Sequence, residues 1–97
     1  MIEYLVTYDV ETITPEGQRR LRQVAKICEG YGLRVQKSVF EVACTRAQLP
    51  ALRQKLSDVI QHSTDSIRLY RLPAGALDTV ELLGIAAIAP HAGDHVL

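Results

Sequence analysis

Apolar residues alternate with other residues from the first positions of the chain. Between residues 2 and 10, every second position carries a β-branched or aromatic side chain: Ile2, Tyr4, Val6, Tyr8 and Val10. This period of two predicts a strand. The intervening positions include Leu5, so the second face of the strand is only partly polar. The pattern therefore favours a central strand that is covered on both faces.

A helix is predicted next, beginning at Pro15. Thr14 is suited to cap its first turn, proline is favoured at the first helical position, and Glu16 places a negative charge at the positive end of the helix dipole. The apolar residues then recur at helical spacing and form one stripe: Leu21, Val24, Ala25 and Cys28. Gly30 and Gly32 predict the end of the helix, with a left-handed glycine as its C-cap.

From residue 33 onward, the chain repeats the change from strand to helix. Residues 33–44 are strand-like but long for one strand, and two strands would meet at a bend or bulge near Lys37 and Ser38. The helix that follows has an apolar stripe made of Leu49, Leu52, Leu56, Val59 and Ile60. Its start is open, because Thr45 and Gln48 match a capping box whereas Pro50 suits a later first turn.

Two further strands are predicted, at residues 65–72 and, shorter, at residues 79–85. The element order then predicts an α+β fold, a ferredoxin-like βαββαβ sandwich with an added C-terminal strand. One domain would span residues 1–85, followed by a tail at residues 86–97. Two helices cover one sheet face and cannot hide Leu5, Phe40 and Leu72 together. We therefore expect a homodimer in which the sheets pack face to face.

Composition and charge narrow the classes of protein. The 97 residues leave room for one core, and the formal net charge is zero, so binding to nucleic acid would need a local basic patch. No run approaches the roughly 18 apolar residues of a membrane span, and the first residues do not predict a signal peptide. Cys28 and Cys44 lack the spacing of a metal site. We expect a cytoplasmic protein with two free, buried thiols and no membrane partner.

A local basic patch is present. It consists of four residues of the first helix and one residue beyond it: Arg19, Arg20, Arg22, Lys26 and Arg34. Such a patch would bind phosphates without sequence preference and more weakly as salt rises. The alternative is an ordinary solvated helix face.

Four blocks of sequence carry a family resemblance. They are Tyr-Asp-Val at 8–10, Arg-Arg-Leu-Arg-Gln-Val-Ala-Lys-Ile-Cys-Glu-Gly-Tyr-Gly at 19–32, Arg-Val-Gln-Lys-Ser-Val-Phe-Glu at 34–41 and Asp-Ser-Ile-Arg-Leu-Tyr-Arg-Leu at 65–72. In this order and at these spacings, they resemble the CRISPR-associated protein two family over roughly residues 1–73. The resemblance implies a ferredoxin-like homodimer whose last strands pair with the partner's sheet.

The resemblance also implies a site. A divalent metal, Mg²⁺ or alternatively Mn²⁺, would lie between the two copies of Asp9. One carboxylate alone is a poor Mg²⁺ site, and a two-fold axis supplies the second. Four other residues match positions that line the family's catalytic cleft: Tyr8, Arg34, Ser38 and Phe40. Without the resemblance, Asp9 would be read as an ordinary turn residue at a strand end.

Three functions follow as hypotheses. The first is a metal-dependent endonuclease that hydrolyses DNA or RNA and serves in CRISPR adaptation, the acquisition of spacers, where the family binds duplex DNA and bridges dimers of an integrase. The second is a catalytically silent DNA-binding scaffold of the same adaptation complex. The third is a small-molecule sensor, which the fold alone does not exclude but which the four blocks do not support.

Overall fold

The structure is a computed structural model, which describes residues 1–84. Its elements follow one another in the order strand, helix, two strands, helix, strand, and a final turn of 3₁₀ helix. Their bounds are β1 Ile2–Asp9, α1 Pro15–Glu29, β2 Gly32–Gln36, β3 Val39–Cys44, α2 Leu49–Val59, β4 Ser66–Leu72 and η1 Ala76–Thr79.

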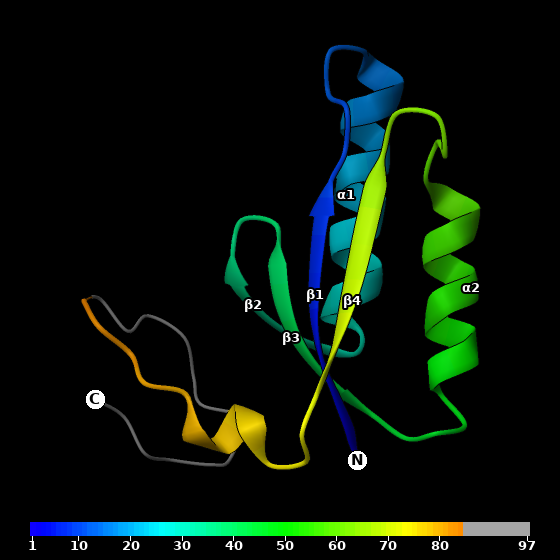
Figure 1. Ribbon diagram of the computed structural model, residues 1–97. Coiled ribbons are helices and arrows are strands. Elements are labelled where there is room, and N and C mark those ends of the chain that lie inside the picture. Colours follow the sequence, from blue (N-terminus) through cyan, green and yellow to red (C-terminus); the bar gives the residue numbers. More distant parts are fainter. Residues whose placement is uncertain (85–97) are drawn as a thin grey trace.

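The strands form one antiparallel sheet in the order β2-β3-β1-β4, with β1 and β3 in its interior. Both helices cover the same face of this sheet (Figure 1). The order of elements and the two-layer arrangement confirm the predicted ferredoxin-like α+β fold. The central position of β1 is also confirmed.

The structure resolves residues 33–44 into two strands, and the turn between them lies near Lys37 and Ser38, where a bend or bulge was expected if two strands were present. β2 ends at Gln36 and β3 begins at Val39, so Lys37 and Ser38 form the connection. The register shifts between Arg34 and Gln36, which marks a bulge or irregularity in β2 beside the turn.

The core lies between the sheet and the helices. Its fully buried members come from strands β1 and β3 and from both helices, among them Val6, Val24, Val42, Leu52 and Phe40. Phe40 is completely buried on the helix-covered face, so we were wrong to group it with Leu5 and Leu72 as a residue that two helices cannot hide. By strand alternation, Leu5 and Leu72 lie on the other face, where both remain partly exposed.

Local capping chemistry determines where the helices begin. Thr14 Oγ1 accepts a hydrogen bond from Gly17 N at 3.0 Å, and Pro15 occupies the first turn of α1, as predicted. At α2, Thr45 and Gln48 do form a reciprocal capping box, with bonds of 2.8 and 3.1 Å, yet the helix itself begins at Leu49 with Pro50 in its first turn. The capping box and the proline in the first turn are therefore both present, and they are not alternatives.

The predicted left-handed C-cap of α1 is wrong. Gly30 has a φ of −70° and stays right-handed, and its N–H bonds to Ile27 O at 3.1 Å. Gly32 is needed for another reason: a Cβ there would lie 2.1 Å from Glu41 O on β3. Glycine at this position permits close approach of two backbones rather than a turn.

After β4 the chain turns at η1 and is tied to the first strand. The carboxylate of Glu3 accepts hydrogen bonds from Gly75 N and Leu77 N, both at 2.9 Å. Residues 80–84 then lead away from the sheet without regular secondary structure (Figure 1). Within the single chain, residues 79–84 of the strand predicted at 79–85 thus do not form a strand, and pairing of that strand with a second copy stays a prediction. Residue 85 and the tail at 86–97 lie outside the described residues.

Candidate functional site

Asp9 is the last residue of β1 and its side chain is exposed. It pairs in register with Ser66, the first residue of β4, so it stands at the rim of the sheet. Within residues 1–84, its carboxylate has no hydrogen bond or ion pair to another side chain. An exposed carboxylate with no partner of its own is available to a ligand from outside the chain.

Tyr8, Arg34 and Phe40 form a compact cluster beside the β2–β3 turn. The rings of Tyr8 and Phe40 stack with centroids 6.2 Å apart, and the guanidinium carbon of Arg34 lies 5.4 Å from the centre of the Phe40 ring. Arg34 Nη2 donates to Tyr8 Oη at 3.3 Å, and that hydroxyl donates to Lys37 O at 3.2 Å. The cluster holds the guanidinium of an exposed arginine in one orientation.

The turn joins this cluster through its backbone. Ser38 O accepts the N–H of Tyr8 at 3.1 Å, which extends the pairing of β1 with β3 by one bond. Ser38 therefore lies beside the cluster through a main-chain bond, and a catalytic role for its side chain stays a prediction.

Asp9 does not belong to that cluster within one chain. Side chains alternate between the faces of a strand, so Tyr8 points into the helix-covered core and Asp9 points to the other side. Of the five predicted residues, Tyr8, Arg34 and Phe40 thus form a cluster on one face, Ser38 lies in the adjoining turn, and Asp9 is a single carboxylate on the opposite face.

A metal at Asp9 fits the donor chemistry only as a shared site. No group of three or more His, Cys, Asp or Glu side chains capable of holding a metal occurs among residues 1–84. Mg²⁺ is usually bound by one or two carboxylates, with waters and phosphate oxygens completing its octahedron. One exposed rim carboxylate supplies half of such a set, and a second copy related by symmetry would supply the other half.

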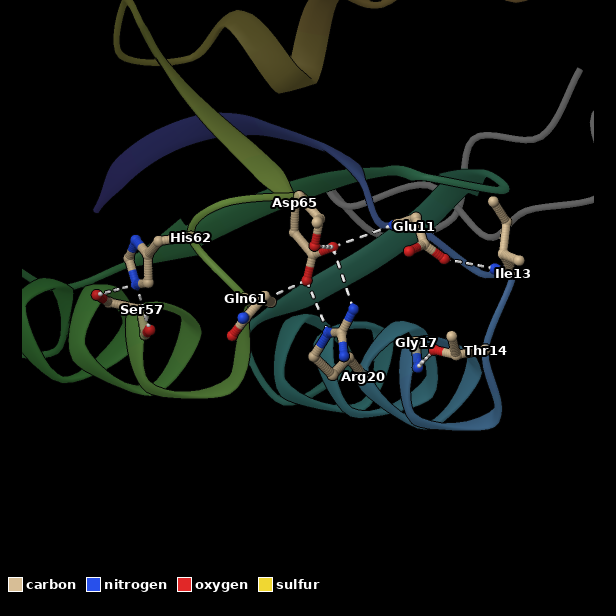
Figure 2. Close-up of polar contacts among 10 residues, drawn as sticks. Glu11, Ile13, Thr14, Gly17, Arg20, Ser57, Gln61, His62 and Asp65 are labelled. Carbon is tan, nitrogen blue, oxygen red and sulfur yellow. Dashed lines mark hydrogen bonds and ion pairs between the residues drawn. The ribbon is translucent and has the colours of Figure 1, made fainter.

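A buried carboxylate near Asp9 was missed by the sequence analysis. Asp65 immediately precedes β4, and its side chain is fully buried. Figure 2 shows it between α1, the loop after β1 and the segment after α2. It accepts hydrogen bonds from four groups: Arg20 Nε at 2.8 Å, Gln61 N at 2.9 Å, Thr64 Oγ1 at 3.0 Å and Glu11 N at 3.1 Å.

These donors keep Asp65 ionised. Burial alone would raise its pKa, but the hydrogen bonds from Arg20, from the backbone of Gln61 and Glu11, and from Thr64 outweigh it and hold the pKa of Asp65 well below the usual range. The signal available in the sequence was the Asp-Ser pair at the start of the fourth block. Nothing in its spacing pointed to Arg20, because the two residues are 45 positions apart.

The predicted basic patch divides into two kinds of residue. Arg20 is ion-paired with Asp65 and largely covered, with a side-chain exposure of 19%. Arg19, Arg22 and Lys26 are exposed along α1, as a phosphate-binding surface requires. Lys26 also lines a surface pocket of about 480 Å³ between the end of α1 and the start of α2, together with Ile27, Gly30, Tyr31, Gln48 and Lys55.

The cysteines are structural. Cys28 and Cys44 are free and buried, as predicted. Burial raises the pKa of Cys28 to about 11, although Arg34 acts in the opposite direction. A thiol that stays protonated near neutral pH is a poor nucleophile.

Fold and rim together define a class: a ferredoxin-like domain with an exposed aspartate at the end of its first strand and a basic first helix. Comparison with known proteins makes the assignment specific. The chain belongs to the family of CRISPR associated protein Cas2, whose model matches residues 1–80. The resemblance carried by the four blocks is confirmed.

The relatives agree with this assignment. The chain is 51% identical over 80 residues to the CRISPR-associated endoribonuclease Cas2 3 of Rhodospirillum rubrum, covering 82% of this chain and 84% of that protein. The crystal structure of Streptococcus pyogenes Cas2 at pH 6.5 matches with a TM-score of 0.76 and 50% identity, over 84% of this chain and 99% of that one.

A chain of a solved assembly also matches. It comes from a structure described as a partial Cas6-RT-Cas1--Cas2 complex, with a TM-score of 0.65, 29% identity and coverage of 86% of this chain and 85% of that chain.

Within residues 1–84, no helix combines the length and the hydrophobicity that a membrane-spanning segment needs.

Proposed function

We propose that the protein is a homodimeric, metal-dependent endonuclease of CRISPR adaptation, in which the two copies of Asp9 share one Mg²⁺ or Mn²⁺ ion. The observation that carries the proposal is the exposed, unpartnered carboxylate at the end of β1 in a chain of the Cas2 family. A relative named an endoribonuclease, at 51% identity, supports nuclease activity.

The residues of this chain have distinct roles in the proposed reaction. When bound, the ion would supply an activated water and neutralise charge on the scissile phosphate. Arg34 is suited to hold a phosphate bidentately, because Tyr8 and Phe40 already fix its guanidinium plane. Tyr8 and Phe40 act as packing partners of Arg34, and the Lys37–Ser38 turn holds Tyr8 from the other side.

Nucleic acid is proposed to approach along α1. Arg19, Arg22 and Lys26 are exposed at helical spacing, and each would contact a phosphate without reading sequence. Arg20, which we included in the patch, is proposed to contribute less than these three because its guanidinium is engaged by Asp65. Both double-stranded DNA and RNA are compatible with such contacts.

Substitution of Asp9 by Ala tests the enzyme. We expect Asp9→Ala to abolish Mg²⁺-dependent cleavage of labelled RNA and duplex DNA while the circular dichroism spectrum and dimer mass stay unchanged. Glu16→Ala removes an exposed carboxylate at the start of α1 and is the matched control, which should cleave as the parent does. Undiminished cleavage by highly purified Asp9→Ala would reject the proposed site.

A second function is favoured by a specific observation. The exposed basic residues of α1 would bind duplex DNA whether or not a metal is held, and a structural neighbour belongs to an assembly whose description includes Cas1 and Cas2. The protein would then be a scaffold that holds duplex DNA and bridges integrase dimers, without catalysis of its own.

Spacer acquisition in cells separates the two functions. If the protein is a scaffold, Asp9→Ala leaves acquisition intact, whereas the double substitution Arg19→Glu, Arg22→Glu weakens duplex binding and reduces acquisition. Arg46→Glu, in the exposed loop before α2, makes a control with a single charge reversal away from α1. Normal acquisition by the double variant would count against the scaffold.

A further inference from the structure

We infer that Asp65, held by Arg20, is a positioning residue. It fixes the backbone around Asp9 and therefore the direction in which the Asp9 carboxylate projects from the end of β1. The inference rests on the proposed metal site at Asp9 and deepens it. The carboxylate of Asp65 gathers donors from three separate parts of the chain: α1 through Arg20, the loop after β1 through Glu11, and the segment after α2 through Gln61 and Thr64.

Asp65 controls the backbone on both sides of Asp9. On one side, Glu11 follows Asp9 by two residues, and its N–H donates to Asp65 Oδ1 at 3.1 Å. On the other, Ser66 follows Asp65 directly and is the residue that pairs with Asp9 across β1 and β4. One buried carboxylate therefore anchors the loop that continues β1 and the strand that lies beside it.

Helix α1 also contacts the loop after β1 and holds it in place. Gly17 packs so closely against the loop that a Cβ would lie 2.0 Å from Glu11 O, and its N–H is capped by Thr14. Arg20, one turn further along α1, reaches Asp65 with Nε at 2.8 Å and Nη2 at 3.5 Å. The rim around Asp9 is thus determined by several independent contacts, as Figure 2 shows for the Asp65 network.

A shared ion makes this rigidity important. In a symmetric pair, any displacement of one Asp9 is repeated by its copy, so the error in the distance between the carboxylates is doubled. Mg²⁺ accepts oxygen ligands only near about 2.0–2.1 Å. Residues that orient metal ligands change metal affinity by about 10- to 100-fold when substituted.

Asp65→Asn tests the inference with little change of volume. Either orientation of the amide turns an NH₂ group toward donors that the carboxylate accepted, so the network cannot be kept whole. We expect the dissociation constant for Mn²⁺, measured by electron paramagnetic resonance of the free ion, to rise about 10- to 100-fold. We also expect faster hydrogen exchange at the amide of Glu11. Arg20→Lys keeps the charge but loses the planar fork, and should give an intermediate effect.

Two controls separate positioning from stability and from the metal site itself. Leu52→Ala creates a cavity in the buried face of α2 and lowers stability away from the rim, so it should leave Mn²⁺ affinity and Glu11 exchange unchanged. Asp9→Ala should lose Mn²⁺ binding with Glu11 exchange unchanged. If Asp9→Ala binds Mn²⁺ as the parent does, the proposed metal site is wrong. Parental Glu11 exchange or parental Mn²⁺ affinity in Asp65→Asn would overturn the positioning role whatever Asp9→Ala shows.

Discussion

Two adjacent residues of β1 have opposite surroundings. Tyr8 is buried among Arg34 and Phe40, whereas Asp9, one peptide bond away, is exposed on the other face. The chemistry of this rim therefore depends on backbone geometry: the end of the strand decides where the carboxylate points. Residues that hold this end, Asp65 above all, matter to the site without belonging to it.

The lowered pKa of Asp65 predicts how stability changes with pH. The carboxyl binds protons less readily in the folded chain than in the unfolded chain, where its pKa is about 3.9. Its contribution to stability is therefore fully present above that value and is lost as the pH falls further toward the lower folded pKa. We expect the free energy of unfolding to fall more steeply below about pH 4 for the parent than for Asp65→Asn. Parallel curves from denaturant titrations between neutral and acid pH would contradict this.

At the scale of elements, the sequence predicted features that depend on neighbouring residues, such as helix caps, but not contacts between residues far apart in the chain. The start of α1 was predicted because Thr14 and Pro15 act within one turn. The end of α1 at Glu29 was also predicted, but the left-handed C-cap was wrong, because Gly30 is right-handed and Gly32 instead permits the close approach of β3. The Arg20–Asp65 pair was missed for the same reason, since its partners are 45 positions apart in the sequence and only the tertiary fold brings them together.

Gly17→Ala tests how tightly α1 packs against the loop after β1. In an isolated helix, alanine is favoured over glycine by about 1 kcal/mol. Here the new Cβ would meet the carbonyl oxygen of Glu11 at 2.0 Å, which no side-chain rotation relieves. We expect a net loss of about 1–3 kcal/mol in the free energy of unfolding, measured by chemical denaturation.

Gly30→Ala is the matched control for that substitution. Its Cβ would approach only Ile27 O, at 3.3 Å, and its backbone is already right-handed, so the loss should be clearly smaller than for Gly17→Ala. Equal losses at the two positions would mean that the contact between α1 and the loop is unimportant.

At the scale of the whole molecule, two helices on one side leave the other sheet face partly bare. Leu5, Val39 and Leu72 alternate onto that face with polar residues, and Tyr70 there is 44% exposed. The sequence indicated this asymmetry because both faces of β1 carry apolar residues. It did not say which face each later strand would contribute, and Phe40 was misplaced as a result.

The predicted face-to-face homodimer can be tested at the centre of this face with Leu5→Lys. Within one chain, Leu5 lies between Glu41 on β3 and Tyr70 on β4, so a lysine has an acidic neighbour and the helix-side core is untouched. In a dimer with packed sheets, two copies of the ammonium would be buried close together, which costs at least about 1–3 kcal/mol. We expect the dissociation constant of the dimer, measured by sedimentation equilibrium, to rise about tenfold or more.

Ala51→Lys, on the exposed side of α2, adds the same charge and should dimerise as the parent does. If Leu5→Lys dimerises equally well while remaining folded, the two chains do not associate through this face, and the two Asp9 carboxylates at its rim have no route to a shared ion.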